Sequence, residues 1–357
     1  MTVPAAASPS RQDPGSRGFR QIDLVSDQPG VAALRDTDLV NAWGLSASPG
    51  TDAAPGSPLW VSDNGKDRTT LYSGASATTV SKTLAVDVAS GTPTGQVFNT
   101  DATGFVIHDG AGHSAPARFI FDTESGSIDG WNPAVGATGP TPSTTTEVAV
   151  RNGANAVYKG LAIATASDGH TYLYAANFRS GRVEAYDDTF TPVELPGGLF
   201  VDPRIPAGYA PFNVQELAGK LYVTYAKQDA TLHDDVAGPG HGFVDVFTND
   251  GAFVRRLVTR GVLNSPWGLA LAPQGFGHLG GALLVGNFGN GRIHAFNATT
   301  GAREGRLRDS HGRPITIDGL WGLQFGNGNA AKTDELLFSA GPADESHGLL
   351  GKIVATR

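Results

Sequence analysis

The sequence predicts an all-β protein that folds as a single six-bladed β-propeller, with an N-terminal strand closing the last blade. Two observations predict this fold. A unit of three or four short β-rich runs recurs six times in 357 residues, and the chain ends one run short of a complete sixth unit. One equivalent residue marks each unit, and the markers are Gly44, Gly104, Gly160, Asn213, Gly268 and Gly322. Their successive separations are 60, 56, 53, 55 and 54 residues, a nearly constant period that a parallel β-helix or a jelly roll would not show.

The first run of each unit carries the repeat most clearly. Three units open on Trp-Gly-Leu, at Trp43, Trp267 and Trp321, and a second β-rich run follows in each. We expect these tryptophans to pack between blades. The same order appears in KGLAIATASDGHTYLYAANFRSGRVEAYD from Lys159, and more faintly in TGFVIHDGAGHSAPARFIFDTESGSIDGWN from Thr103.

The two ends of the chain predict how the ring closes. Only 35 residues follow the last marker, so the sixth unit has no run left for an outer strand. The run FRQIDLVSD, residues 19–27, precedes the first unit and has no blade of its own. Pairing this run with the last blade would remove an exposed sheet edge. We therefore predict a disordered leader over residues 1–17 and one propeller domain over residues 18–357.

Composition narrows the function classes. The net charge is −8, and no segment gathers Lys and Arg, so the electrostatic term that drives nucleic-acid binding is missing. The absence of cysteine excludes disulfides, thiolate metal sites and a Cys nucleophile. No apolar run approaches the ~20 residues of a membrane span. G-x-S-x-G, H-E-x-x-H, a P-loop and a dinucleotide fingerprint are also absent, which removes the enzyme classes that depend on them.

A polar residue ends the second run in four of the six units. These residues are Asp63, Asp122, Asn177 and Asn287. Because every second strand of a propeller ends at the face where the first strand begins, we expect all four at one mouth of the tunnel. Their oxygen atoms are the ligands that Ca²⁺ prefers, so they predict a Ca²⁺ site there, or a site for another divalent metal. The alternatives are a salt bridge to Lys227 and separate turn caps.

Two long loops follow the second runs of blades four and six. The first is KQDATLHDDVAGPGHG and the second is AGPADESHG. Long loops within compact repeats are often functional. As catalytic candidates we take His241, His347 and Glu345, with either histidine as a general base. As substrate contacts we take Lys227, Gln228 and Asp229. A loop histidine is also commonly an ordinary solvated residue.

The motifs PLWVSDNG, YAANFRSGRVEAYD, YVTYAKQD, GPGHGFVDVF, SPWGLALAP, LLVGNFGNGRI, DGLWGLQFG and FSAGPADESHG carry a resemblance that runs from residue 19 to the C-terminus. They look like a family of secreted bacterial propellers, some of whose members have a PEP-CTERM sorting tail. The resemblance implies a secreted or periplasmic protein and brings no established activity. More distantly, the layout is similar to the NHL and gluconolactonase/paraoxonase propellers, in which Asp, Asn and Glu side chains bind Ca²⁺ at the tunnel mouth and the enzymes open lactones.

The sequence leaves two main functions open. One is an exported enzyme that uses a metal at the tunnel mouth to hydrolyse an ester or a lactone. The other is a non-catalytic binding module for a glycan, a peptide or a small molecule at the same mouth, and a structural role of the outer rim is a third reading. In each case we expect a monomer that binds no nucleic acid and has no membrane-spanning segment.

Overall fold

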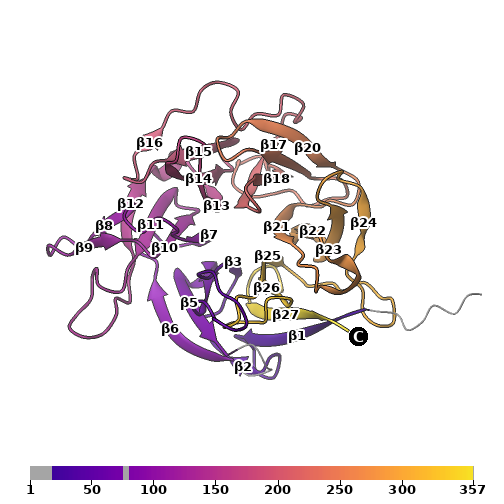
Figure 1. The fold of residues 1–357 in the computed structure, drawn as a ribbon, viewed down its shortest axis with the longest axis horizontal. Helices are drawn as coiled ribbons and strands as arrows, with labels where there is room; N and C mark the ends of the chain where they lie inside the picture. Colours follow the sequence, from indigo (N-terminus) through magenta and orange to yellow (C-terminus); the bar gives the residue numbers. More distant parts are fainter. Residues whose placement is uncertain (1–17, 75–79, 357) are drawn as a thin grey trace, which may run out of the picture.

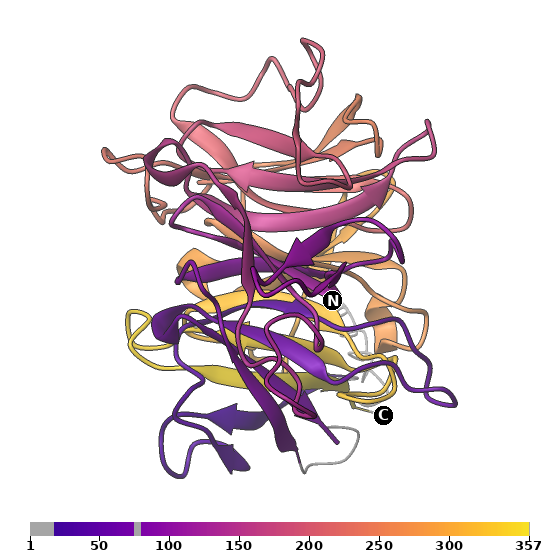
Figure 2. The ribbon, with the colours of Figure 1, turned by 90° about the vertical axis from the view of Figure 1, so that its left-hand side faces the viewer.

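The computed structural model describes residues 18–74 and 80–356, so the predicted leader over residues 1–17 lies outside the described residues. In this part of the chain six antiparallel sheets surround a central axis, which confirms the six-bladed β-propeller (Figure 1). Figure 2 shows the ring from its side, with loops projecting from both faces. Within the described residues there is no helix long and apolar enough to cross a bilayer.

Each blade has four strands, numbered here from the tunnel outward. The innermost strands are β3 (Ala42–Ser46), β7 (Pro93–Phe98), β13 (Tyr158–Thr165), β17 (Tyr209–Glu216), β21 (Pro266–Leu271) and β25 (Leu320–Phe325). The second strands are β4 (Leu59–Asp63), β10 (Phe119–Thr123), β14 (Thr171–Asn177), β18 (Leu221–Lys227), β22 (Ala282–Asn287) and β26 (Leu336–Ala340). The third strands are β5 (Arg68–Ser73), β11 (Ser127–Trp131), β15 (Arg182–Tyr186), β19 (Phe243–Phe247), β23 (Arg292–Asn297) and β27 (Leu349–Ala355).

The outer strands complete the blades. They are β6 (Ser81–Asp87), β12 (Glu147–Arg151), β16 (Pro192–Val193), β20 (Phe253–Thr259), β24 (Arg303–Arg306) and β1 (Phe19–Ser26). A short strand, β2 (Leu34–Arg35), pairs in parallel with β1. The 3₁₀ turns are η1 (Asn64–Lys66), η2 (Gly153–Asn155), η3 (Gly277–Leu279) and η4 (Phe288–Asn290).

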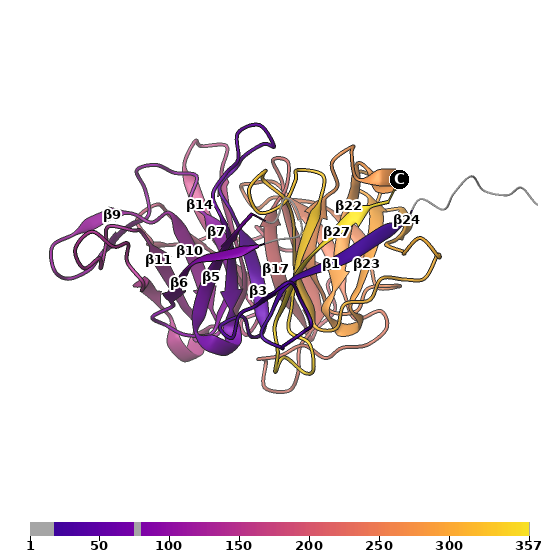
Figure 3. The same cartoon turned by 90° about the horizontal axis from the view of Figure 1, so that it is seen from below.

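The predicted closure is confirmed. The N-terminal strand β1 pairs antiparallel with β27, from Phe19 opposite Ala355 to Ser26 opposite Leu349, and Figure 3 shows the two strands side by side. Phe19 is buried and packs against Phe276 of blade five, with 4.8 Å between the ring centroids. The closing strand therefore completes the sixth sheet and also joins it to the fifth.

The prediction for blade two was wrong at its inner strand. That strand is β7, whose Gly95 takes the place assigned to Gly104. The segment after β7 instead forms an inserted hairpin of β8 (Val106–His108) and β9 (Ser114–Pro116), which lies at the rim of the ring (Figure 1). The apolar residues of this hairpin pack on the outer part of blade two, so they show the same alternation as a blade strand.

The inner strands of neighbouring blades approach most closely at the repeat glycines. A Cβ added at Gly44 would lie 2.4 Å from the backbone oxygen of Thr94, which real Cβ atoms do not tolerate. Blade four has Asn213 at this place, and its Nδ2 donates to the backbone oxygen of Trp267 at 2.9 Å. The repeat glycine is therefore set by the packing of blade against blade.

The residues just before these glycines face the tunnel axis, and four of them are the aromatic residues Trp43, Phe212, Trp267 and Trp321. The rings of Trp43 and Trp321 stack at 3.5 Å, and Trp267 meets Trp43 edge-on at 6.0 Å. Blades one and five are not neighbours, so the tryptophans meet across the tunnel and do not lie only between adjacent blades. We call these four residues the aromatic plug.

Candidate functional site

The two aspartates predicted as metal ligands are fully buried at the ends of their strands. The Oδ1 atom of Asp122 accepts a hydrogen bond from Thr94 Oγ1 at 2.8 Å, and burial raises the pKa of Asp122 to about 7. Neither oxygen of Asp63 has a hydrogen-bond partner within the described residues, and burial raises its pKa well above the ordinary value.

The two asparagines of the predicted set are also buried. The side chain of each donates a hydrogen bond to a neighbouring protein group. Asn177 Nδ2 donates to Glu184 Oε1 at 2.6 Å. Asn287 Nδ2 donates to the backbone oxygen of Val262 at 2.8 Å. Hydrogen bonds of this kind are typical of asparagines that stabilise turns and strand ends. The Ca²⁺ site at these four residues stays a prediction, and the structure gathers a different set of charged groups at this mouth.

A buried lysine gathers these charged groups. Lys159, the second residue of β13, is only 2% exposed and precedes the repeat glycine, where three other blades have tryptophan. Its ammonium bonds to Glu124 Oε1 and lies 3.1 Å from Asp234 Oδ1. It also lies 5.2 Å from the centroid of the Trp43 ring, where a cation is attracted to the ring face. Lys159 therefore links the aromatic plug to the carboxylates above it.

Loops from several blades bring the partners of Lys159 together. Each loop joins a second strand to a third, so all lie at the face where the inner strands begin. They supply Glu124 from blade two, His233 and Asp234 from blade four and Glu345 from blade six. We call these four residues with Lys159 the mouth cluster. Asn64 of blade one supports it, because its Nδ2 donates to Glu124 Oε2 at 2.9 Å.

The mouth cluster carries an excess of negative charge. Burial lowers the pKa of Lys159, but Glu124 and Asp234 outweigh this effect and raise it, so the ammonium stays charged. Burial raises the pKa of Glu345 to about 7, and the charge of Glu124 adds to that rise. The neighbouring Asp235 also has a raised pKa, chiefly because of burial. Among the described residues, the three carboxylates of the mouth cluster and the neighbouring Asp235 thus share the charge of Lys159.

Glu345 lies on a strained turn. Ala343, Asp344 and Glu345 have φ values of +56°, +51° and +63°, in the left-handed region that costs roughly 1–2 kcal/mol for each non-glycine residue. The backbone N–H of Glu345 donates to the oxygen of Gly341 at 3.1 Å, which closes the turn. Strain of this kind concentrates at functional sites. The raised pKa and the strained backbone therefore point independently to Glu345.

We expect Glu345→Gln to stabilise the protein at pH 8 by up to about 3 kcal/mol and to have little effect near pH 4.5. The folded state holds the proton on Glu345 up to a pKa of about 7, compared with an ordinary value of 4.5. The contribution of this carboxyl group to the free energy of unfolding therefore decreases as the pH rises from about 4.5 to about 7. The amide of glutamine does not ionise, so the variant does not show this decrease. Urea unfolding of both proteins between pH 4.5 and 8 measures the difference. Glu194→Gln, at an exposed site, is the control, and parallel curves for Glu345→Gln and the wild type would contradict the assignment.

The two histidines predicted as general bases lie at the same face but outside the mouth cluster. His347 Nδ1 lies 2.8 Å from Asp27 Oδ2, beside the closing strand. His241 Nδ1 donates to the backbone oxygen of Val236 at 2.7 Å, within its own loop. Among the described residues neither ring bonds to the mouth cluster. The histidine that joins the cluster is His233, whose Nδ1 lies 2.9 Å from Asp234 Oδ1.

The three predicted substrate contacts lie at the start of the same blade-four loop. Gln228 Nε2 donates to the backbone oxygen of Phe178 at 2.5 Å. Asp229 Oδ1 accepts the backbone N–H of His233 at 2.9 Å, which shapes the turn that carries Asp234. Lys227 ends β18, and the structure shows no salt bridge from it to Asp63 or Asp122 within the described residues. These residues position the loop.

Comparison with known proteins identifies relatives over nearly the whole chain, although no family model matches. The uncharacterized protein R648 of Acanthamoeba polyphaga mimivirus is 32% identical over 337 residues, which cover 92% of this chain and 78% of that protein. The uncharacterized protein L690 of the same virus is 34% identical over 340 residues, covering 93% and 84%. These relatives are viral, so bacterial export stays a prediction from the sequence motifs.

Solved structures show likeness of fold alone. A structural-genomics protein of unknown function from Bacteroides thetaiotaomicron aligns with a TM-score of 0.55 at 11% identity, over 96% of this chain and 77% of that one. An aldose sugar dehydrogenase from Streptomyces coelicolor, solved in its PQQ-bound form, aligns with a TM-score of 0.50 at 14% identity, over 96% and 100%.

Proposed function

The chain belongs to the protein family that contains R648 and L690 of Acanthamoeba polyphaga mimivirus, and we propose that its mouth cluster binds a divalent cation and hydrolyses an ester or a lactone. One observation carries this proposal: among the described residues, the three carboxylates of the mouth cluster and the neighbouring Asp235 share the buried Lys159 beside His233. Burial is the main cause of the raised pKa of Glu345, and the negative charge of Glu124 adds to it, which supports a site where positive charge is in demand. A divalent cation would supply that charge.

The donor atoms fit such a cation. Glu124, His233 and Asp234 each offer one ligand atom, and the three atoms lie within 4.8 Å of one another. Two carboxylates with an imidazole suit Zn²⁺ or a related transition metal better than Ca²⁺, which prefers oxygen ligands only. We therefore place the proposed cation at these three residues and keep Ca²⁺ as the competing ion in the tests.

The chain's own groups then have defined roles. A divalent cation bound here would polarise a carbonyl group or a water molecule. Glu345, with a pKa of about 7, can accept a proton from water near neutral pH. Lys159 uses two of its three N–H donors on Glu124 and Asp234, and its fixed positive charge favours an oxyanion that develops nearby.

The test combines metal analysis with an activity screen. After dialysis against Zn²⁺, Mn²⁺ or Ca²⁺ we expect about one transition-metal ion per chain, and Glu124→Gln should weaken its binding at least tenfold. A panel of esters and lactones, assayed with and without chelator, should show hydrolysis that depends on the metal and is lost in Glu345→Gln. Glu194→Gln should retain both properties.

The other outcomes are equally informative. Metal binding without hydrolysis of any panel compound would favour the non-catalytic binding module. Hydrolysis that survives the chelator would remove the cation from the proposal. Weaker Ca²⁺ binding in Asp63→Ala, with Glu124→Gln unaffected, would move the site to the buried strand ends.

A further inference from the structure

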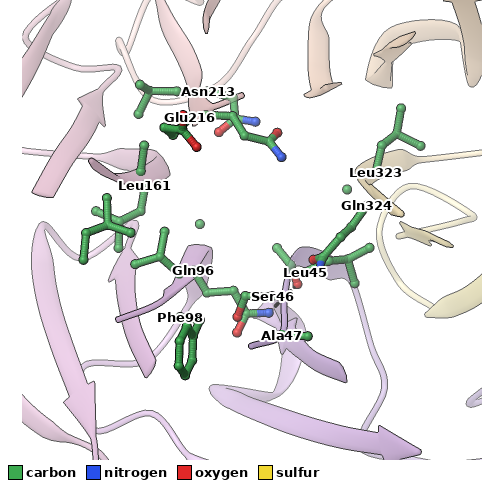
Figure 4. Close-up of a pocket in the computed structure, with 18 of the residues that line it drawn as sticks. Leu45, Ser46, Ala47, Gln96, Phe98, Leu161, Asn213, Glu216, Leu323 and Gln324 are labelled. Atoms are coloured by element: carbon green, nitrogen blue, oxygen red, sulfur yellow. Dashed lines mark hydrogen bonds between the residues drawn. The ribbon is translucent and has the colours of Figure 1, made fainter. Parts of the chain in front are cut away.

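The end of the tunnel opposite the mouth cluster holds a cavity of about 280 Å³. Its lining comes from the second halves of the inner strands, and Figure 4 shows Gln96, Asn213 and Gln324, from three different blades, around one central opening. Trp267 of the aromatic plug also lines the cavity. The plug therefore separates this cavity from the mouth cluster.

A buried amide in this cavity has a free acceptor. Gln96 is 6% exposed, and its Nε2 donates to the backbone oxygens of Gly44 and Trp60 at 2.6 and 2.8 Å. Both amide hydrogens thus face blade one, which fixes the orientation of the side chain. Its Oε1 atom has no hydrogen-bond partner among the described residues, and neither does the hydroxyl of Ser46, which is also 6% exposed. Buried polar groups without partners are costly, so both call for a ligand that brings hydroxyl groups.

Apart from one carboxylate, the rest of the lining is uncharged. Its polar side chains include three glutamines and an asparagine, and it contains no Lys, Arg, His or Asp. Its one carboxylate, Glu216, accepts the backbone N–H of Gly219 at 2.6 Å. Leu45, Leu161 and Leu323 supply apolar surface between the amides. An anionic ligand would find no cationic side chain in this lining, whereas amides offer donors and acceptors together.

We propose that this cavity binds a small, neutral, polyhydroxylated molecule, of the class of monosaccharides and polyols. Alternating hydroxyl groups and C–H faces match a lining that alternates amides with leucines. The volume, about 280 Å³, lies just below the range of roughly 300–1,000 Å³ for ligand pockets, which limits the occupant to a small molecule. This site is independent of the proposed cation centre, because the aromatic plug lies between them.

Saturation-transfer NMR with a panel of neutral monosaccharides and polyols tests the proposal, with a uronic acid as the charged counterpart. We expect neutral members to bind with a Kd of about 1 mM or tighter and the uronic acid to bind more weakly. Gln324 makes no side-chain hydrogen bond within the described residues, so Gln324→Leu should fold normally and weaken binding roughly threefold to tenfold. Gln96→Met should weaken it at least as much.

The matched control is Gln274→Leu, the same change at an exposed loop position, which should leave binding unchanged. Glu124→Gln should also leave it unchanged, and this separates the cavity from the proposed metal site. No signal from any neutral compound, equal binding of the uronic acid, or equal binding by Gln324→Leu and Gln274→Leu would each overturn the proposal.

Discussion

Deleting residues 1–27 is expected to leave a propeller that does not fold stably at 25 °C. The deletion removes β1, so β27 loses its partner from Leu349 to Ala355. It also removes the buried side chains of Phe19, Leu24 and Val25, each worth roughly 1.5–3 kcal/mol. Their sum, about 5–9 kcal/mol, is comparable to the whole stability of a typical domain. Circular dichroism and thermal melts of the purified protein measure the loss.

Two companions make this deletion a sharp test. A deletion of residues 1–15 removes none of the described residues, and we expect its melting temperature to match that of the full chain. A synthetic peptide of residues 18–28, added to the longer deletion, should restore part of the lost stability because it can pair with the open edge of β27. Equal melting temperatures for the two deletions would show that β1 does not close the ring.

The closure was predictable because it depends on counting runs. Each blade needs four strands. The last blade lacks one run and the N-terminus has one run too many, so the sequence predicts that the N-terminal run completes the last blade. The observed strand ends at Ser26, one residue before the predicted end. This prediction did not require any knowledge of which side chains contact one another.

Blade two was predicted wrongly because the repeat there is carried by weak signals. Its inner strand, PTGQVF, has a threonine where three other blades have tryptophan. The repeat glycine is the one residue of the Trp-Gly-Leu motif that this strand keeps. The inserted hairpin buries Ile107 and thus copies the alternation of an inner strand. Alternation shows that a run is half-buried, but it does not show which neighbours bury it.

The sequence placed the right loops at the right mouth but missed the central residue. Lys159 holds the position that Trp43, Trp267 and Trp321 hold in other blades, and a comparison of the six units at that position would have found it. Its partners could not be predicted, because Glu124 and Asp234 come from different blades. Which loop side chains meet over the tunnel depends on the packing of all the blades.

Lys159→Met is expected to destabilise the protein by about 3–5 kcal/mol at pH 8 in the presence of chelator. The methionine keeps an apolar stem beside Trp43, but Glu124, whose side chain is only 15% exposed, loses its counter-charge. Removing one partner of a buried ion pair leaves the other charge uncompensated, at a cost of this size. Burial raises the pKa of Asp234, and the charge of Lys159 is the largest effect that lowers it below its ordinary value. Without that charge the pKa of Asp234 should rise, so the loss of stability should shrink as the pH falls toward 4.

The same variant tests whether the cluster accepts a divalent cation. With the ammonium gone, Zn²⁺ or Mn²⁺ should bind more tightly and restore part of the stability, by about 2.7 kcal/mol at a concentration 100 times the Kd. Lys352→Met is the matched control, because Lys352 is also buried (1% exposed) and pairs with Glu335 at 2.8 Å, away from the group of possible metal ligands that the described residues form at Glu124, His233 and Asp234. We expect that control to lose stability without recovering it in metal, since the described residues form no group of three possible metal ligands beside Lys352. If melts in chelator and in metal give the same loss for Lys159→Met, or the same recovery for both variants, the mouth cluster does not bind a cation through Glu124, His233 and Asp234.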